Sequence, residues 1–179
     1  MEIKETVIEG CFEVKHKIHG DDRGYFFEAF NEKKLEICGG KFDVKQVNFA
    51  SSNKGIIRGL HYQLQPYSQT KLVGVLQGVV IDVVVDLRKN SKTYMEVFKI
   101  EINSKETGLI VPKGLAHGYE VMEDNTIFYY AVDQFYSPDH ERGVNFMDSE
   151  LSIDIKTEKP EQSEKDKNLP YLAFAEHNF

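Results

Sequence analysis

Residues 79–88 read VVIDVVVDLR, and this stretch indicates the fold class because its side chains alternate in character with a period of two. Successive side chains of a β-strand point to opposite faces, so alternation over this length predicts a strand. One face carries an apolar row and the other carries the charges, that is, Val79, Ile81, Val83, Val85 and Leu87 opposite Asp82, Asp86 and Arg88.

The segments around this strand have the same character. Residues 97–103, VFKIEIN, alternate in the same way, and residues 109–123 and 126–136 are rich in β-branched and aromatic side chains. Turn signals such as Gln77-Gly78 and Glu123-Asp124-Asn125 separate them at short intervals. Many short strands with frequent turns predict an all-β protein, an antiparallel sandwich or barrel.

Two segments interrupt the strand pattern. A short helix is predicted from Asn31 to Cys38, with Asn31 as its N-cap and Gly39-Gly40 as its stop. Residues 158–170, EKPEQSEKDKNLP, are charged and contain two prolines, so composition alone predicts a solvated tail. The length suits one domain and no internal boundary is visible, so we expect residues 1–179 to form a single domain.

Composition narrows the functional classes. The 22 Lys and Arg against 29 Asp and Glu give a net charge of −7, which opposes nonspecific binding to nucleic acid or anionic membrane. No segment is apolar for long enough to span a bilayer, and the N-terminal residues lack the apolar run of a signal peptide, so we expect a cytoplasmic protein. Cys11 and Cys38 are too few for a disulfide framework or a zinc ribbon, and we expect free thiols.

Residues 58–63, RGLHYQ, together with Lys71, place a base and two cations in one short region. If these residues lie on strands of one sheet, His61 can take a proton while Lys71 and Arg58 stabilise the anion left behind. This combination suits the removal of a proton from carbon. Taken singly, each side chain could equally be an ordinary surface residue.

Residues 112–118, PKGLAHG, have the Pro-x-Gly-x-x-His form found in the second half of a cupin jelly roll. Metal-binding cupins carry an earlier His-x-His pair, so that several imidazoles and a carboxylate converge on one ion. Here the earlier element is His61-Tyr62-Gln63, with a single histidine. A metal-dependent isomerase or oxygenase is therefore the weaker hypothesis.

From about Val14 to Pro170 the chain resembles the dTDP-4-dehydrorhamnose 3,5-epimerase family. Six segments carry the resemblance in order: DDRGYFFEAF (21–30), QVNFASSNKGIIRGLHYQ (46–63), QTKLVGVLQGVVIDVVVDLRKNS (69–91), VPKGLAHGY (111–119), FYYAVDQFYSPDHERGV (128–144) and SEKDK (163–167). The resemblance implies a cupin-type antiparallel jelly roll with a few short helices, working as a homodimer without metal or other cofactor.

The implied reaction inverts C3 and C5 of dTDP-4-dehydro-6-deoxy-D-glucose, giving dTDP-4-dehydro-L-rhamnose in deoxysugar biosynthesis. The C4 ketone acidifies the hydrogens on both neighbouring carbons, so each can be removed as a proton to leave an enolate. A base on one face of the sugar and an acid on the other then suffice for inversion.

The family's catalytic residues match four positions of this sequence. His61 matches the base, Asp166 the carboxylate paired with it, Lys71 the cation near the C4 oxygen and Tyr130 the acid on the far face. Asp166 lies in the charged segment, so the resemblance implies that residues 150–179 or thereabouts pack near the active site. Tyr129 precedes Tyr130, and only one of two neighbouring strand residues can face the interior.

The resemblance also implies a set of substrate-binding residues. Arginines contact the diphosphate, aromatic side chains hold the base, and residues 21–28 reach the site of the partner subunit. The matched positions are Arg23, Phe26, Glu28, Gln46, Asn48, Arg58, His117, Tyr136 and Lys165. From the residues alone, Phe26 would be assigned to the core and His117 could be a hydrogen-bonded core histidine.

Other functions remain open at this point. Close relatives invert only C3 or only C5, or isomerise other nucleotide-linked 4-keto sugars. Tyr67 and Ala131 depart from the family's frequent proline and lysine, and either could adjust the sugar pocket. A noncatalytic cupin that binds a sugar nucleotide would keep the arginines and aromatics without needing His61 and Asp166 together.

Overall fold

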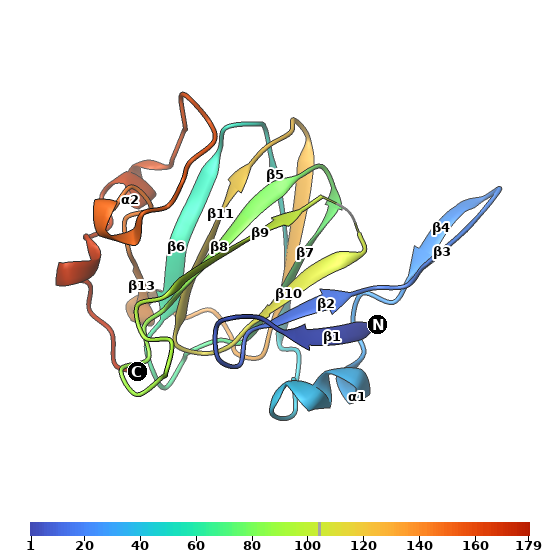
Figure 1. Cartoon of the computed structure of the whole chain (residues 1–179), viewed down its shortest axis with the longest axis horizontal. Coiled ribbons are helices and arrows are strands. Elements are labelled where there is room, and N and C mark those ends of the chain that lie inside the picture. The colour runs from blue at the N-terminus through green and yellow to red at the C-terminus, as the bar shows by residue number, and fades with distance from the viewer. Residues whose placement is uncertain (104) are drawn as a thin grey trace.

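The computed structural model describes residues 1–103 and 105–179 and contains two packed antiparallel sheets (Figure 1). The first sheet runs in the order β1 (Glu2–Glu5), β2 (Phe12–Lys15), β10 (Thr107–Val111), β7 (Lys71–Gln77), β12 (Thr126–Val132), β5 (Gln46–Ser52). The second runs in the order β13 (Glu141–Gly143), β6 (Ile57–Gln63), β11 (Leu115–Val121), β8 (Val80–Asp86), β9 (Val97–Ile102). The predicted all-β jelly roll is confirmed.

The main core lies between the two sheets. Side chains from β7, β10 and β12 meet side chains from β8, β9 and β11, and this cluster includes Val73, Leu109, Phe128, Val84, Ile102 and Tyr119. Full burial of one such apolar side chain stabilises the fold by roughly 1.5–3 kcal/mol. The core fills one end of the sandwich and leaves the other end to polar side chains.

The orientation of β8 is the main surprise of the fold. Its predicted apolar row does not face the space between the sheets, because Val83, Val85 and Leu87 pack outward in a second cluster with Phe146 and Leu172. The opposite face, which carries Asp82 and Asp86, points inward and is also buried. Both faces of this strand are covered.

The C-terminal segment covers the outer face of the second sheet. It contains η3 (Ser149–Leu151), the one-turn helix α2 (Glu164–Lys167) and η4 (Leu172–Phe174), which lie outside β6 in Figure 1. The buried Glu120 carboxylate accepts hydrogen bonds from the backbone of Lys156 and Thr157, and Glu161 pairs with Ile56. The prediction of a solvated tail, made from composition alone, is therefore wrong.

The predicted helix is confirmed as α1 (Glu32–Leu35) followed by η1 (Glu36–Cys38). The Asn31 side chain accepts a hydrogen bond from the Lys34 backbone, and Gly39 ends the element with a φ of 99°. The hairpin of β3 (Ile18–Asp21) and β4 (Gly24–Phe27), called the arm below, extends away from the two sheets (Figure 1).

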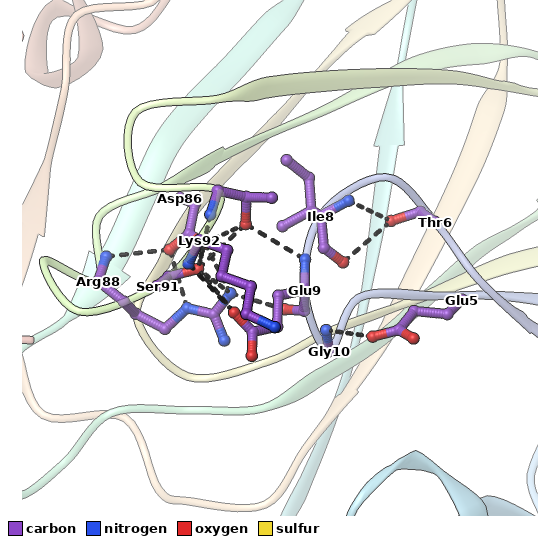
Figure 2. Close-up of polar contacts among 10 residues, drawn as sticks. Glu5, Thr6, Ile8, Glu9, Gly10, Asp86, Arg88, Ser91 and Lys92 are labelled. Atoms are coloured by element: carbon purple, nitrogen blue, oxygen red, sulfur yellow. Dashed lines mark hydrogen bonds and ion pairs between the residues drawn. The ribbon is translucent and has the colours of Figure 1, made fainter.

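Asp86 and Arg88 form a structural network. Figure 2 shows the buried Asp86 carboxylate bound to Arg88 and Ser91, while Arg88 also reaches the Glu9 carbonyl at 2.6 Å. These contacts join the loop after β8 to the β1–β2 turn. Cys11 and Cys38 are both free thiols, and no helix in the described part of the chain is long and apolar enough to cross a membrane.

Candidate active site

A cavity of about 340 Å³ opens between the two sheets at the polar end of the sandwich. It brings together all the predicted catalytic residues with Arg58, His117, Tyr136 and Lys165. The remaining lining residues are Ala50, Tyr62, Gln63, Gln69, Gly118, Tyr119, Phe128, Glu141 and Ser163. Both sheets and the C-terminal segment therefore contribute to one site.

Two glycines let the strands carrying the cavity histidines approach closely. A Cβ on Gly59 would lie 2.6 Å from the Gly118 Cα, and a Cβ on Gly118 would lie 2.5 Å from the Arg58 carbonyl oxygen. Gly59 also has a φ of +111°, a conformation that side chains disfavour. This contact places His61 on β6 directly opposite His117 on β11.

His61 is paired with Asp166 from α2. The distance between His61 Nε2 and Asp166 Oδ1 is 2.7 Å. Burial alone would raise the pKa of Asp166, but the hydrogen bonds from His61 and from the Gly59 N–H hold it below its usual range. Because an ionised carboxylate can only accept, Nε2 carries the proton, and the Nδ1 of the neutral ring keeps a lone pair for a substrate proton.

Lys71 approaches from the facing sheet. The expectation that His61 and Lys71 lie on strands of one sheet is wrong, because β6 and β7 belong to different sheets and these side chains meet across the space between them. The Lys71 Nζ donates to the His61 carbonyl at 3.3 Å. Burial lowers the pKa of Lys71 to about 8, with Asp82 and Glu141 partly opposing the shift.

The activity should therefore fall in alkaline solution. Below pH 8 Lys71 is an ammonium ion that can stabilise an enolate, and it loses this charge as the pH rises through its pKa of about 8. We expect kcat/KM to decline above that pH by roughly tenfold per pH unit. A Lys71→Arg variant, whose charge persists, should lack this decline, and a wild-type profile that stays flat to about pH 10 would contradict the assignment.

His117 is held by the carboxylate of Asp82, a residue that the sequence alone does not single out. Its Nε2 lies 3.1 Å and 3.0 Å from the two carboxylate oxygens of Asp82, and both residues are buried. Burial lowers the pKa of His117 although Asp82 opposes the shift, so the ring is neutral at pH 7 and donates to Asp82. The sequence signal for this partner is a carboxylate, Asp82, within an otherwise apolar strand.

The choice between the two neighbouring tyrosines is clear from β12. Tyr130 lines the cavity, whereas Tyr129 is buried beside Gly74 and outside the cavity lining. Burial raises the pKa of Tyr130, and Glu141 adds to the shift, so the phenol keeps its proton at neutral pH. Ala131 packs toward Leu35 and Phe42 on the outer face, so the expectation that it adjusts the sugar pocket is wrong.

Glu141 is the second residue that sequence reasoning missed. Its carboxylate accepts a hydrogen bond from the Tyr136 hydroxyl at 2.5 Å and forms an ion pair with the Lys165 ammonium group at 2.6 Å. Burial works to raise the pKa of Glu141, but these contacts outweigh it and lower the pKa. Glu141 lies opposite Gln63 across β13 and β6, a pairing that the sequence does not reveal.

The remaining predicted residues lie outside the cavity. Arg23 and Phe26 are exposed on the arm, where Arg23 pairs with Asp21, and Glu28 binds Asn31 and Lys34. Gln46 and Asn48 lie on the edge strand β5 and bond to each other at 2.8 Å, and the Tyr136 backbone approaches Gln46 at 3.4 Å. Within a single chain, Gln46 and Asn48 therefore lie near the cavity residue Tyr136, whereas the residues of the arm lie away from the cavity.

The protein side chains offer little for a metal ion. Within residues 1–103 and 105–179 there is no cluster of three or more His, Cys, Asp or Glu side chains placed to hold one. Metal-free catalysis itself stays a prediction.

Comparison with known proteins identifies the family. Residues 5–173 match the family model for dTDP-4-dehydrorhamnose 3,5-epimerase. The chain belongs to this family. A member from Shigella flexneri, named dTDP-4-dehydrorhamnose 3,5-epimerase, is 39% identical over 170 residues, with 94% of each chain covered.

Solved structures of other family members agree in fold. The dTDP-4-dehydrorhamnose 3,5-epimerase from Bacillus anthracis, solved with TDP and PPi bound, has a TM-score of 0.91 and 41% identity, covering 96% of this chain and 99% of that one. The Legionella pneumophila enzyme, in complex with dTDP-4-keto-L-rhamnose, has a TM-score of 0.92 and 36% identity, covering 97% of this chain and 93% of that one.

Proposed function

We propose that this family member inverts C3 and C5 of dTDP-4-dehydro-6-deoxy-D-glucose to give dTDP-4-dehydro-L-rhamnose. The observation that carries the proposal is the 2.7 Å contact between His61 and Asp166 in a cavity that also contains Lys71 and Tyr130. A base, its carboxylate partner, a buried cation and a protonated phenol are the groups that enolisation and reprotonation require.

Each inversion follows from these groups. The His61 Nδ1 takes the proton from the carbon beside the ketone, and the electron pair moves onto the C4 oxygen, where Lys71 stabilises the negative charge. Tyr130 then donates its proton to the other face of that carbon as the ketone reforms. His61 releases its proton to water and the phenolate regains one, so each cycle is balanced. The second carbon is inverted by the same steps.

The nucleotide end of the substrate is assigned to the cationic and aromatic groups at the cavity. Arg58 and Lys165 supply positive charge for a diphosphate, and Tyr136 offers a ring for the base. A noncatalytic binding protein has no use for the His61–Asp166 pair, which argues for the enzyme. Cytoplasmic location, and the absence of nucleic-acid and membrane partners, stay predictions.

We also propose that the enzyme works as a homodimer in which the arm of one subunit completes the site of the other. The arm extends from the body and exposes Tyr25, Phe26 and Arg23, and the edge strand β5 exposes Val47 and Phe49. Apolar and cationic groups left in water in this way suit a protein surface that a second copy covers.

Mixing two inactive variants tests the shared site. His61→Ala and Arg23→Ala should each be inactive alone, whereas a mixed dimer contains one site with both residues intact. With free subunit exchange, about a quarter of wild-type activity should return in an equal mixture. Exchange is verified with differently tagged chains. If mixed dimers form without recovery, each site is built from one chain.

Product analysis tests the function itself. The enzyme is incubated with dTDP-4-dehydro-6-deoxy-D-glucose, and proton couplings of the sugar ring identify which carbons have been inverted. The proposal expects inversion at both, and expects it to survive exhaustive chelation. Inversion at one carbon would favour a mono-epimerase, and activity restored only by added metal would exclude the metal-free mechanism.

A further inference from the structure

Asn145 joins the strand that carries His61 to the helix that carries Asp166. It follows β13, whose Gly143 pairs with His61 and whose neighbour Val144 exchanges backbone hydrogen bonds with Leu60 at 3.0 Å and 3.1 Å. From this position the Asn145 Nδ2 donates to the carbonyls of Lys167 and Leu169, at 3.2 Å and 3.3 Å. Its backbone N–H donates to the Pro170 carbonyl at 2.8 Å.

The orientation of the Asn145 amide is fixed by its surroundings. The Oδ1 atom accepts a hydrogen bond from the Met147 backbone at 2.9 Å, so the NH₂ group must face the two carbonyls. The side chain is buried, with 9% of the residue exposed. Leu169 packs against the same point of β13, because a Cβ on Gly143 would lie only 2.7 Å from the Leu169 Cδ1.

Helix α2 depends on such contacts for its position. A helix of one turn is not stable by itself. The Lys165 and Asp166 carbonyls accept hydrogen bonds from backbone N–H groups just after the helix, whereas the Lys167 carbonyl is bound by the Asn145 side chain. On its N-terminal side the chain is held where Glu161 pairs with Ile56. On its C-terminal side Asn145 binds the Lys167 carbonyl, one residue after Asp166.

We propose that Asn145 is a positioning residue that sets the geometry of the His61–Asp166 hydrogen bond. The inference rests on the proposed function, because it gives Asn145 a role only through that pair. Loss of the amide contacts frees the end of α2, so the Asp166 carboxylate no longer holds the His61 ring and its Nε2–H tautomer. A displacement of about 1 Å in a catalytic group can cost roughly 10²-fold in rate.

The test replaces the Asn145 amide donor by a carboxylate of nearly the same shape. Asn145→Asp retains an acceptor for Met147 but turns an oxygen toward the Lys167 and Leu169 carbonyls. We expect kcat to fall by about 10–100-fold. Asn168→Ala is the matched control, because the Asn168 amide also binds an α2 carbonyl, that of Glu164 at 2.6 Å, without reaching β13. This control should keep wild-type kcat.

Two further readouts separate positioning from general loss of structure. In ¹⁵N NMR of the histidine rings, Asn145→Asp should shift His61 from the Nε2–H tautomer toward a mixture, and Asn168→Ala should not. Adding Asn145→Asp to Asp166→Asn should change kcat by less than about threefold, because residues that act through one another are not additive. If Asn145→Asp does not fold, Asn145→Ala, which removes the donor without adding a charge, is used in the same comparisons.

The outcomes distinguish the two proposals. Wild-type kcat in Asn145→Asp, or fully additive losses in the double variant, would overturn the positioning role while leaving the His61–Asp166 pair in place. Wild-type activity in Asp166→Asn would overturn the proposed mechanism itself. Binding of TDP is measured in parallel, because Lys165 lies on the same helix, and a loss of TDP affinity with kcat unchanged would also overturn the positioning role.

Discussion

His61→Ala should abolish both epimerisation and the uptake of deuterium from D₂O at C3 and C5. His61 and His117 both line the cavity and both pair through Nε2 with a carboxylate, but 29% of the His61 side chain is exposed against 6% of His117, so the His61 ring is the more accessible to a substrate. Loss of general-base catalysis typically costs about 10²–10⁴-fold, and proton abstraction precedes every later step. Exchange is followed by proton NMR of the sugar.

A histidine outside the cavity serves as the control for this variant. His177, in the C-terminal segment, packs near Tyr94 and does not line the cavity. His177→Ala should therefore keep both exchange and epimerisation. If His61→Ala still introduces deuterium at either carbon at the wild-type rate, another group is the base and the assignment is wrong.

Tyr130→Phe should separate the two halves of the reaction. The ring remains but the acidic hydroxyl is lost, so His61 can still form the enolate and return a solvent-derived proton to the original face. We expect inversion to fall by about 10²–10⁴-fold while deuterium exchange persists at one carbon at least. The ratio of exchange to inversion in D₂O measures the effect.

The neighbouring tyrosine provides the control. Tyr129 lies on the same strand but is buried outside the cavity lining, so Tyr129→Phe should keep the wild-type ratio of exchange to inversion. Wild-type inversion in Tyr130→Phe would require another acid on the far face.

The sequence predicts the strands better than the faces they present. The alternation in residues 79–88 correctly predicts β8, but both of its faces are buried, so hydrophobicity could not tell the inner face from the outer one. The apolar row lies under the C-terminal segment, whose charged composition gives no sign that it packs. Asp82 lies on the charged face of the alternation, yet it is fully buried against His117.

His61 and Lys71 could be proposed from the residues themselves, whereas Asp166 and Tyr130 follow only from the resemblance. The distance in sequence between His61 and Asp166 gives no reason to pair them. Tertiary contacts, those of Glu161 and Asn145 among them, bring the segment back to β6. Glu141 was missed because its role depends on the pairing of a three-residue strand with β6. Such contacts follow from tertiary packing, which local sequence periodicity does not encode.

The most direct test of the central claim is proton NMR of dTDP-4-dehydro-6-deoxy-D-glucose incubated with the wild-type enzyme in D₂O. If His61 enolises both carbons next to the ketone, the signals of H3 and H5 should disappear, and the rhamno product should carry deuterium at both carbons. An inverted carbon that retains its original hydrogen would contradict enolisation at that position, and a substrate that keeps both hydrogens and both configurations would contradict the account as a whole.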